Sequence, residues 1–232
     1  MNCIITGGTK GIGRAIATIF AENGFNLAIV ARSTDDLEAM EKDFESKYPI
    51  EVHTFPTDLS QKDQVLRFCE LIQTHWDKVD VLVNNAGMFV QGSMLEEDDG
   101  LMEQMMTVNF FSAYHLTRTF APMMIEQGKG HIFNICSVAS IKAFADSGSY
   151  VASKFALLGF TRSLRLELLD KNVSVTAVLP GSTDTASWEG ADIDSERLMD
   201  PKDVAKAVWS AWQMSERTVV EEILLRPRSG DL

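Results

Sequence analysis

Cysteine is scarce in this chain, and its three copies, Cys3, Cys69 and Cys136, lie far apart. An odd number without a Cys-x-x-Cys spacing argues against a disulfide framework. No apolar run approaches the roughly 20 residues that a transmembrane helix needs. The first apolar run leads directly into a glycine-rich turn at Gly7, which leaves no room for a secretory signal peptide. These absences predict a protein of the reducing cytoplasm.

Positive charge is also scarce, because 33 acidic residues outnumber 21 basic ones and the formal net charge is −12. A chain this acidic is a poor partner for DNA or anionic membranes, so we expect no nucleic acid and no membrane among its partners. Its four histidines, His53, His75, His115 and His131, show no paired ligand spacing, and no metal site is predicted. The length of 232 residues and the 45% hydrophobic content are typical of a globular domain.

What the sequence does have is an alternation of short β-branched runs with longer amphipathic stretches. The runs predict strands at residues 2–6, 26–31, 51–56, 80–85, 131–136, 173–179 and 219–225. Helical periodicity starts near Ile12, Thr34, Lys62, Asp98, Tyr150 and Pro201. Since parallel strands need crossovers, the pattern predicts a doubly wound α/β fold, a seven-stranded parallel sheet with helices on both faces. No linker divides it, so residues 1–232 are expected to form one domain.

Two aspartates have the appearance of helix starts: Asp58 before Leu59-Ser60, and Asp200 before Pro201. Ligands of such sheets bind beyond the carboxyl ends of the strands, where the strand order reverses. The chemistry is therefore expected in the loops that follow Thr6, Ala31, Asn84, Cys136 and Leu179.

The turn after the first strand contains Gly7, Gly11 and Gly13 and runs into a predicted helix. Glycines permit a tight turn and close backbone approach, so free amides at the helix start can hold a pyrophosphate. The spacing G-x-x-x-G-x-G differs from the G-x-G-x-x-G dinucleotide fingerprint. A turn that only joins strand to helix stays open on this evidence.

Two cations flank the same predicted pocket. The second strand ends at Arg32 without a carboxylate at its tip, and Lys10 lies in the first loop. An acidic residue there reads a ribose 2′-hydroxyl, whereas a 2′-phosphate requires arginine or lysine, so NADP(H) is favoured over NAD(H). Asp35 and Asp36 argue the other way, but they fall in the first turn of the next helix, where the helix dipole favours acidic residues.

Tyr150 and Lys154 are four residues apart at a predicted helix start and share one face. A nearby cation favours the phenolate and lowers a phenol pKa that is ordinarily about 10, which makes tyrosine a usable acid or base. Taken alone, such a pair more often decorates a helix surface.

The pair belongs to a longer series. In chain order stand Thr6-Gly7-x-x-x-Gly11-x-Gly13, Asn84-Asn85-Ala86-Gly87, Asn109, Ser137, Tyr150-x-x-x-Lys154, and Pro180-Gly181 with Thr185. In these motifs the chain resembles the short-chain dehydrogenase/reductase family, in its NADP(H)-preferring branch. The resemblance implies a Rossmann-like fold and hydride transfer between a nicotinamide and a small carbonyl or secondary alcohol.

The resemblance also implies residue roles. Tyr150 would be the general acid or base, Ser137 would polarise the same carbonyl oxygen, Lys154 would bind the nicotinamide ribose and lower the Tyr150 pKa, and Asn109 would hold a water that relays protons. The residues implied in cofactor binding are Gly7, Thr9, Lys10, Gly11, Ile12, Gly13, Arg32, Asp58, Leu59, Asn85, Ala86, Gly87, Tyr150, Lys154, Pro180, Gly181, Thr183 and Thr185.

Substrate choice is expected in Met88 and Phe89, in residues 138–144, and in a loop at about 182–198. Trp188 in that loop is a candidate lid residue. One alternative is a 3-oxoacyl-carrier-protein reductase, which docks an acidic partner; Lys129 and Lys171 make only a weak basic patch for it.

A second alternative, from another class, is a catalytically silent NADP(H)-binding redox sensor, although the complete set of motif residues favours an enzyme. Apolar excess on the helices around residues 110–124 and 155–168 predicts a homodimer or homotetramer.

Overall fold

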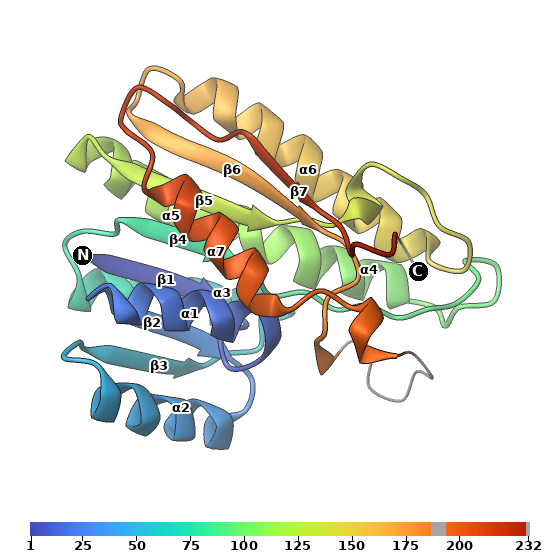
Figure 1. Ribbon diagram of the computed structural model, residues 1–232, viewed down its shortest axis with the longest axis horizontal. Coiled ribbons are helices and arrows are strands. Elements are labelled where there is room, and N and C mark those ends of the chain that lie inside the picture. Colours follow the sequence, from blue (N-terminus) through green and yellow to red (C-terminus); the bar gives the residue numbers. More distant parts are fainter. Residues whose placement is uncertain (187–193, 231–232) are drawn as a thin grey trace.

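The computed structural model describes residues 1–186 and 194–230, and its centre is a seven-stranded parallel sheet (Figure 1). The strands are β1 (Asn2–Thr6), β2 (Asn26–Ala31), β3 (Val52–Pro56), β4 (Val81–Asn84), β5 (Gly130–Ile135), β6 (Val173–Pro180) and β7 (Glu222–Leu225). They lie in the order β3-β2-β1-β4-β5-β6-β7, so the winding reverses between β1 and β4. The predicted doubly wound sheet is confirmed.

Helices cover both faces of the sheet. They are α1 (Gly11–Glu22), α2 (Thr34–Lys47), α3 (Lys62–His75), α4 (Leu101–Met106), α5 (Ser112–Gln127), α6 (Gly148–Leu168) and α7 (Pro201–Trp212). Side chains of α1, α2 and α7 pack with Ile5 of β1 in one core, and those of α3, α5 and α6 pack with Ile4 in the other. Successive strand residues face opposite sides, which is why neighbours in β1 enter different cores. Among the described residues, no helix has both the length and the apolar character needed to cross a bilayer.

One of the two predicted helix starts is confirmed and the other is wrong. The Asp200 side chain accepts a hydrogen bond from the Lys202 amide at 2.8 Å and caps α7. Asp58 precedes α3, which begins only at Lys62. The Asp58 carboxylate instead accepts from the Ser60 amide at 2.9 Å, so it closes a turn between β3 and α3.

The helical stretch predicted from Asp98 is interrupted by a π-helical turn, Thr107–Phe111, between α4 and α5. The side chain of Asn109, at the centre of this turn, is buried and hydrogen-bonded to the backbone of Met88. Such turns are frequent at functional sites, because the extra residue re-aims a side chain. Helical periodicity alone gave no sign of it.

Strand β7 at the sheet edge is tied to α6 by a buried guanidinium. Arg165 donates to the Val175 carbonyl at 3.0 Å and to the Glu221 carbonyl at 2.6 Å. Arg162, one turn earlier, donates to Glu222 at 2.7 Å, and this bond lowers the pKa of the Glu222 carboxyl. These bonds join α6 to β6 and to the start of β7, and removing one partner would leave the buried Arg165 charge uncompensated.

His131 in β5 makes folding stability depend on pH. Its ring is stacked on Phe133, lies 2.7 Å from the Thr176 hydroxyl and is buried, and this burial lowers its pKa to about 3. The unfolded chain therefore binds this proton near pH 6.5 and the folded chain does not, so stability present above pH 6.5 is lost as pH falls toward 3.

We expect the free energy of unfolding to fall by about 2 kcal/mol from this group between pH 6.5 and pH 5. Urea unfolding of the wild type and of His131→Gln at pH 7.5 and pH 5 measures it, with His75→Gln at an exposed position as the control. An equal pH response in wild type and His131→Gln would contradict the assignment.

Candidate active site

The loop after β4 is hydrogen-bonded to the glycine-rich turn after β1. Thr6 Oγ1 accepts from the backbone amides of Asn85, at 3.0 Å, and Ala86, at 2.9 Å. The Asn85 side chain donates to the carbonyls of Thr6, at 2.8 Å, and Gly7, at 3.1 Å. The two segments that were predicted to meet where the strand order reverses are therefore hydrogen-bonded to each other. The Asn85 side chain binds directly to the backbone of the turn.

The glycines of this turn are required by close packing. A Cβ on Gly13 would overlap the Gly7 carbonyl oxygen and the Asn85 amide. Gly11 has a φ of +54° and faces the Thr185 methyl, 2.9 Å from where its Cβ would be. Within residues 1–186 and 194–230 no side chain caps the first turn of α1, so its amides remain available to an anion. The close packing of this turn thus requires glycine, and the free amides that follow it can also bind a pyrophosphate.

The two cations predicted for the cofactor pocket, Lys10 and Arg32, differ in their bonding. Lys10 Nζ lies 2.9 Å from Asp36 Oδ2, and this hydrogen bond lowers the pKa of the Asp36 carboxyl. Asp36 lies in the first turn of α2, with its amide donating to the Ser33 hydroxyl. Arg32 is exposed and has no hydrogen bond or ion pair with any residue in the described ranges. Arg32 is the free cation of the pair, which sequence reasoning did not foresee.

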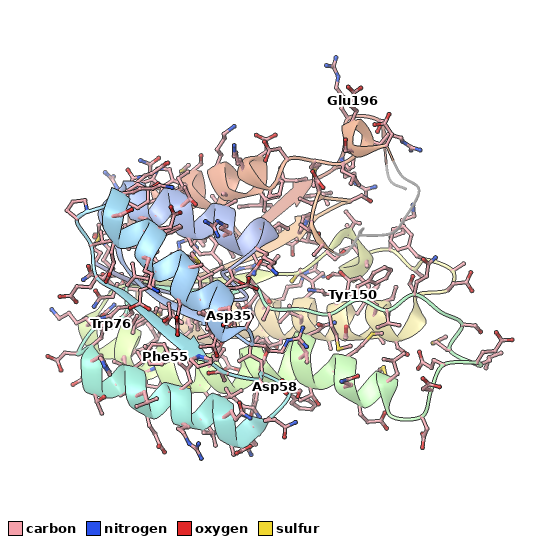
Figure 2. The ribbon with its side chains drawn as sticks, turned by 90° about the horizontal axis from the view of Figure 1, so that it is seen from below. Asp35, Phe55, Asp58, Trp76, Tyr150 and Glu196 are labelled. Carbon is pink, nitrogen blue, oxygen red and sulfur yellow. The ribbon has the colours of Figure 1, made fainter. Side chains whose placement is uncertain are left out.

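The residues predicted to contact the adenine follow β3. Leu59 is buried and Asp58 is half-buried. In Figure 2, Asp35, Asp58 and Tyr150 lie toward the carboxyl-end side of the molecule and Trp76 lies toward the opposite side. Two residues predicted to bind the cofactor, Asp58 after β3 and Tyr150 on α6, therefore lie on the same side of the molecule.

Tyr150 and Lys154 lie on the first turns of α6. The Lys154 ammonium is buried, donates to the Ile135 carbonyl at 2.9 Å, and lies 5.8 Å from the centre of the Tyr150 ring. A Cβ on Gly87 would be 3.5 Å from this ammonium. Lys154 is thus held beside Tyr150 and close to the backbone that follows β4. It is buried and does not lie on the exposed face of the helix.

Ser137 follows β5 and is buried. Its Oγ accepts from the Ala139 amide at 3.0 Å, and its own amide donates to the Ser140 hydroxyl at 3.2 Å. These bonds close the short 3₁₀ turn Val138–Ser140 and fix the serine. Within the described part of the chain its hydroxyl donates no bond, so that hydrogen remains available to a ligand.

The side chain of Asn109 is committed to protein partners. Its Oδ1 accepts from the Met88 amide at 2.7 Å, and its Nδ2 donates to the Met88 carbonyl at 3.0 Å and to Ser153 Oγ at 2.9 Å. Ser153 in turn donates to the Tyr150 carbonyl at 2.7 Å. Asn109 therefore connects the loop after β4 to the helix that carries Tyr150. Sequence reasoning missed Ser153, although it is a small polar residue three positions after Tyr150.

The loop after β6 lies against the glycine-rich turn. Gly181 donates to the Leu225 carbonyl at 2.8 Å, the Thr183 hydroxyl donates to the Gly181 carbonyl at 2.9 Å, and Thr185 packs on Gly11. Pro180 ends β6 just before them. Trp188, the candidate lid residue, lies outside the described residues.

The sequence and the fold of this chain are similar to those of known proteins. The family model for short chain dehydrogenases matches residues 2–195. The chain belongs to the short-chain dehydrogenase family. It is 36% identical to a sepiapterin reductase of Chlorobaculum tepidum, over 99% of this chain and 97% of that one. It is 31% identical to an uncharacterised oxidoreductase of Staphylococcus saprophyticus, over 97% of this chain and 96% of that one.

Solved structures of other short-chain dehydrogenases have the same fold. A metagenomic short-chain oxidoreductase in complex with NADP superimposes with a TM-score of 0.86 at 30% identity, covering 98% of this chain and 96% of that one. An alcohol dehydrogenase from Thermococcus sibiricus, complexed with 5-hydroxy-NADP, gives a TM-score of 0.91 at 28% identity and the same coverage. This short-chain dehydrogenase is thus an oxidoreductase that interconverts CH–OH and C=O groups with a nicotinamide cofactor.

Proposed function

We propose that this dehydrogenase reduces a small carbonyl compound with NADPH, and that Tyr150 is its general acid. The observation that carries the proposal is the buried Lys154 ammonium, which lies beside the Tyr150 ring and Gly87 and is bonded to the Ile135 carbonyl, two residues before buried Ser137. A pterin-like carbonyl is the first substrate to try, because the sepiapterin reductase relative is similar over nearly its whole length.

The residues divide the chemistry between them. NADPH, when bound, supplies the hydride that adds to the carbonyl carbon. The Tyr150 hydroxyl donates its proton to the carbonyl oxygen, so that hydride and proton together complete the alcohol. The Ser137 hydroxyl donates to the same oxygen and stabilises its developing charge. The Lys154 ammonium favours the phenolate that proton transfer leaves on Tyr150.

The cofactor would lie along the carboxyl ends of the strands, starting at the glycine-rich turn after β1. Amides of Gly11, Ile12 and Gly13 would take the pyrophosphate, Asp58 and Leu59 the adenine, and the segment Pro180–Thr185 the nicotinamide. We further propose that NADP(H) is preferred over NAD(H), with Arg32 as the main reader of the 2′-phosphate, since Lys10 is already paired with Asp36. Neighbours bound to NADP or 5-hydroxy-NADP support this preference.

The other candidates have less support. A carrier-protein substrate would need a basic docking surface, yet Lys171 is paired with Asp170 at 2.9 Å and Lys129 lies over the Trp212 ring at 5.7 Å. A catalytically silent redox sensor would not require Tyr150, Lys154 and Ser137, the residues to which the proposed catalysis is assigned. We keep the loop at 182–198 as the proposed substrate loop.

The assembly and location are also proposals. Phe111, the last residue of the π-helical turn before α5, and Phe155 of α6 are 42% and 46% exposed, which supports a homodimer or homotetramer built on these helices. Cys3, Cys69 and Cys136 are unpaired, as expected in the cytoplasm.

The function is tested by following nicotinamide absorbance with NADPH and with NADH, over sepiapterin, α-diketones, sugars and 3-oxoacyl thioesters. We expect turnover with NADPH on small carbonyls, and a rise of about tenfold in the NADPH KM for Arg32→Ala with the NADH KM unchanged. Lys10→Ala is the comparison and should change the NADPH KM less. Turnover restricted to carrier-protein thioesters, or an NADH preference in the wild type, would contradict the proposal.

A further inference from the structure

Among the residues that the structure describes, the aromatic ring in contact with the proposed acid belongs to Phe89, two residues beyond Gly87. The Phe89 and Tyr150 rings meet edge to face, with centroids 4.9 Å apart and planes inclined at 73°. Phe89 is half-buried, so part of its ring is available to a ligand. An aromatic ring in this position borders the space into which Tyr150 delivers its proton.

The position of Phe89 is fixed through its neighbour. Both backbone groups of Met88 are hydrogen-bonded to the buried side chain of Asn109, at 2.7 and 3.0 Å. The same asparagine is connected through Ser153 to the Tyr150 carbonyl. The two rings are therefore held by one network, and a ligand meets Phe89 in a preorganised orientation.

The rest of this loop lies against the start of α6. The Gly92 amide donates to the Asp146 carbonyl at 2.8 Å, and the Ser149 hydroxyl donates to Glu97. Met94 covers Gly148, where a Cβ would overlap the methionine side chain. The wall beside Tyr150 is thus one packed unit made of residues 88–97 and 146–149.

This wall presents apolar side chains to solvent. Val90 is 40%, Met94 63% and Leu95 95% exposed. The nearby Lys142 ammonium lies 4.9 Å from the Phe144 ring centre. Exposed apolar surface beside a reacting group favours a ligand that buries apolar area there, and it offers little to a polyhydroxylated or anionic one.

We propose that Phe89 is a specificity-determining residue, which selects carbonyl compounds carrying a planar unsaturated or aromatic group next to the carbonyl. The inference rests on the proposed function and narrows its substrate class. The planar group packs on the Phe89 ring while the carbonyl oxygen lies at Tyr150 and Ser137. Offset or edge-on ring pairs are favourable beyond the area that they bury, which gives this class its advantage.

Two α-diketones test this inference, because 1-phenylpropane-1,2-dione and butane-2,3-dione differ only by phenyl in place of methyl at one end. For Phe89→Leu we expect kcat/KM with NADPH to fall about tenfold on the phenyl compound, and to stay within about twofold on the methyl compound. Phe89→Tyr keeps the ring and should retain the phenyl preference. Leu71→Ala, an exposed change on α3 outside this wall, is the matched control and should leave the ratio of the two unchanged.

A second readout separates this inference from the proposed function. Calorimetric titration of the phenyl dione into each variant with NADP⁺ gives a Kd without turnover, and Phe89→Leu should weaken it about tenfold. An equal loss on both diones, or no change in either ratio or Kd, would overturn the role of Phe89 even if the wild type is active. A wild type that binds the phenyl dione through Phe89 yet reduces nothing would leave this inference standing and would refute the reductase function.

Discussion

Tyr150→Phe should reduce kcat by about 10²- to 10⁴-fold, the contribution typical of a positioned general acid. The change removes one hydroxyl and keeps the ring, so the contact with Phe89 and the fold are preserved. The Kd for NADPH should change little, because the proposed anion-binding amides lie in the first turn of α1, on a different helix from Tyr150. Steady-state kinetics and fluorescence titration of NADPH measure the two quantities separately.

Tyr114→Phe provides the control for that experiment. Tyr114 on α5 is half-buried, and its hydroxyl accepts only a long bond from Arg118 at 3.5 Å, so turnover should be unchanged. If Tyr150→Phe kept most of the wild-type turnover, the proton would have to come from another group and the proposed mechanism would be wrong. A wild type that binds NADPH but turns over no carbonyl would favour the sensor alternative.

Gly13→Ala is expected to be the most disruptive small change in the chain. The added methyl would overlap the Gly7 carbonyl and the Asn85 amide, and backbone at that point cannot move aside without breaking the turn. We expect a loss of about 3 kcal/mol in the free energy of unfolding, which corresponds to a fall of about 6–12 °C in Tm. NADPH binding should weaken as well, because the amides of the turn move.

Gly159→Ala is the same substitution in another helix and serves as the control. A Cβ there meets no atom within 4 Å, so alanine should raise stability by up to about 1 kcal/mol through its better helix propensity. Differential scanning calorimetry of the two variants gives both shifts. Equal Tm changes would show that the turn tolerates a side chain and that its glycines serve another purpose.

The strands and their parallel arrangement could be predicted from the sequence, because buried parallel strands are short β-branched runs that end at glycine or polar residues. Helix starts were less secure. Asp200 caps a helix and Asp58 closes a turn, although the two look alike in sequence. What separates them is whether the following residues continue into a helix at once, and after Asp58 they do not.

The site was predictable as a meeting of loops, because the carboxyl ends of neighbouring parallel strands share one edge. Its internal bonding was not. The π-helical turn depends on Asn109 reaching the Met88 backbone, 21 residues away, and the pairing of Lys10 with Asp36 depends on the orientation of two side chains. Both are tertiary features without a local signal.

The bond between Arg165 and Glu221 gives this enzyme a vulnerable interval during synthesis. The two residues are 56 positions apart, so a ribosome that adds about 5–20 residues per second makes the second roughly 3–11 s after the first. Throughout that interval the guanidinium has no Glu221 carbonyl to bind, and the edge of β6 from Ala177 to Pro180 has no β7 beside it. An open strand edge is a template for pairing with other chains. Nascent chains halted between these points are therefore the form of this protein most in need of a chaperone.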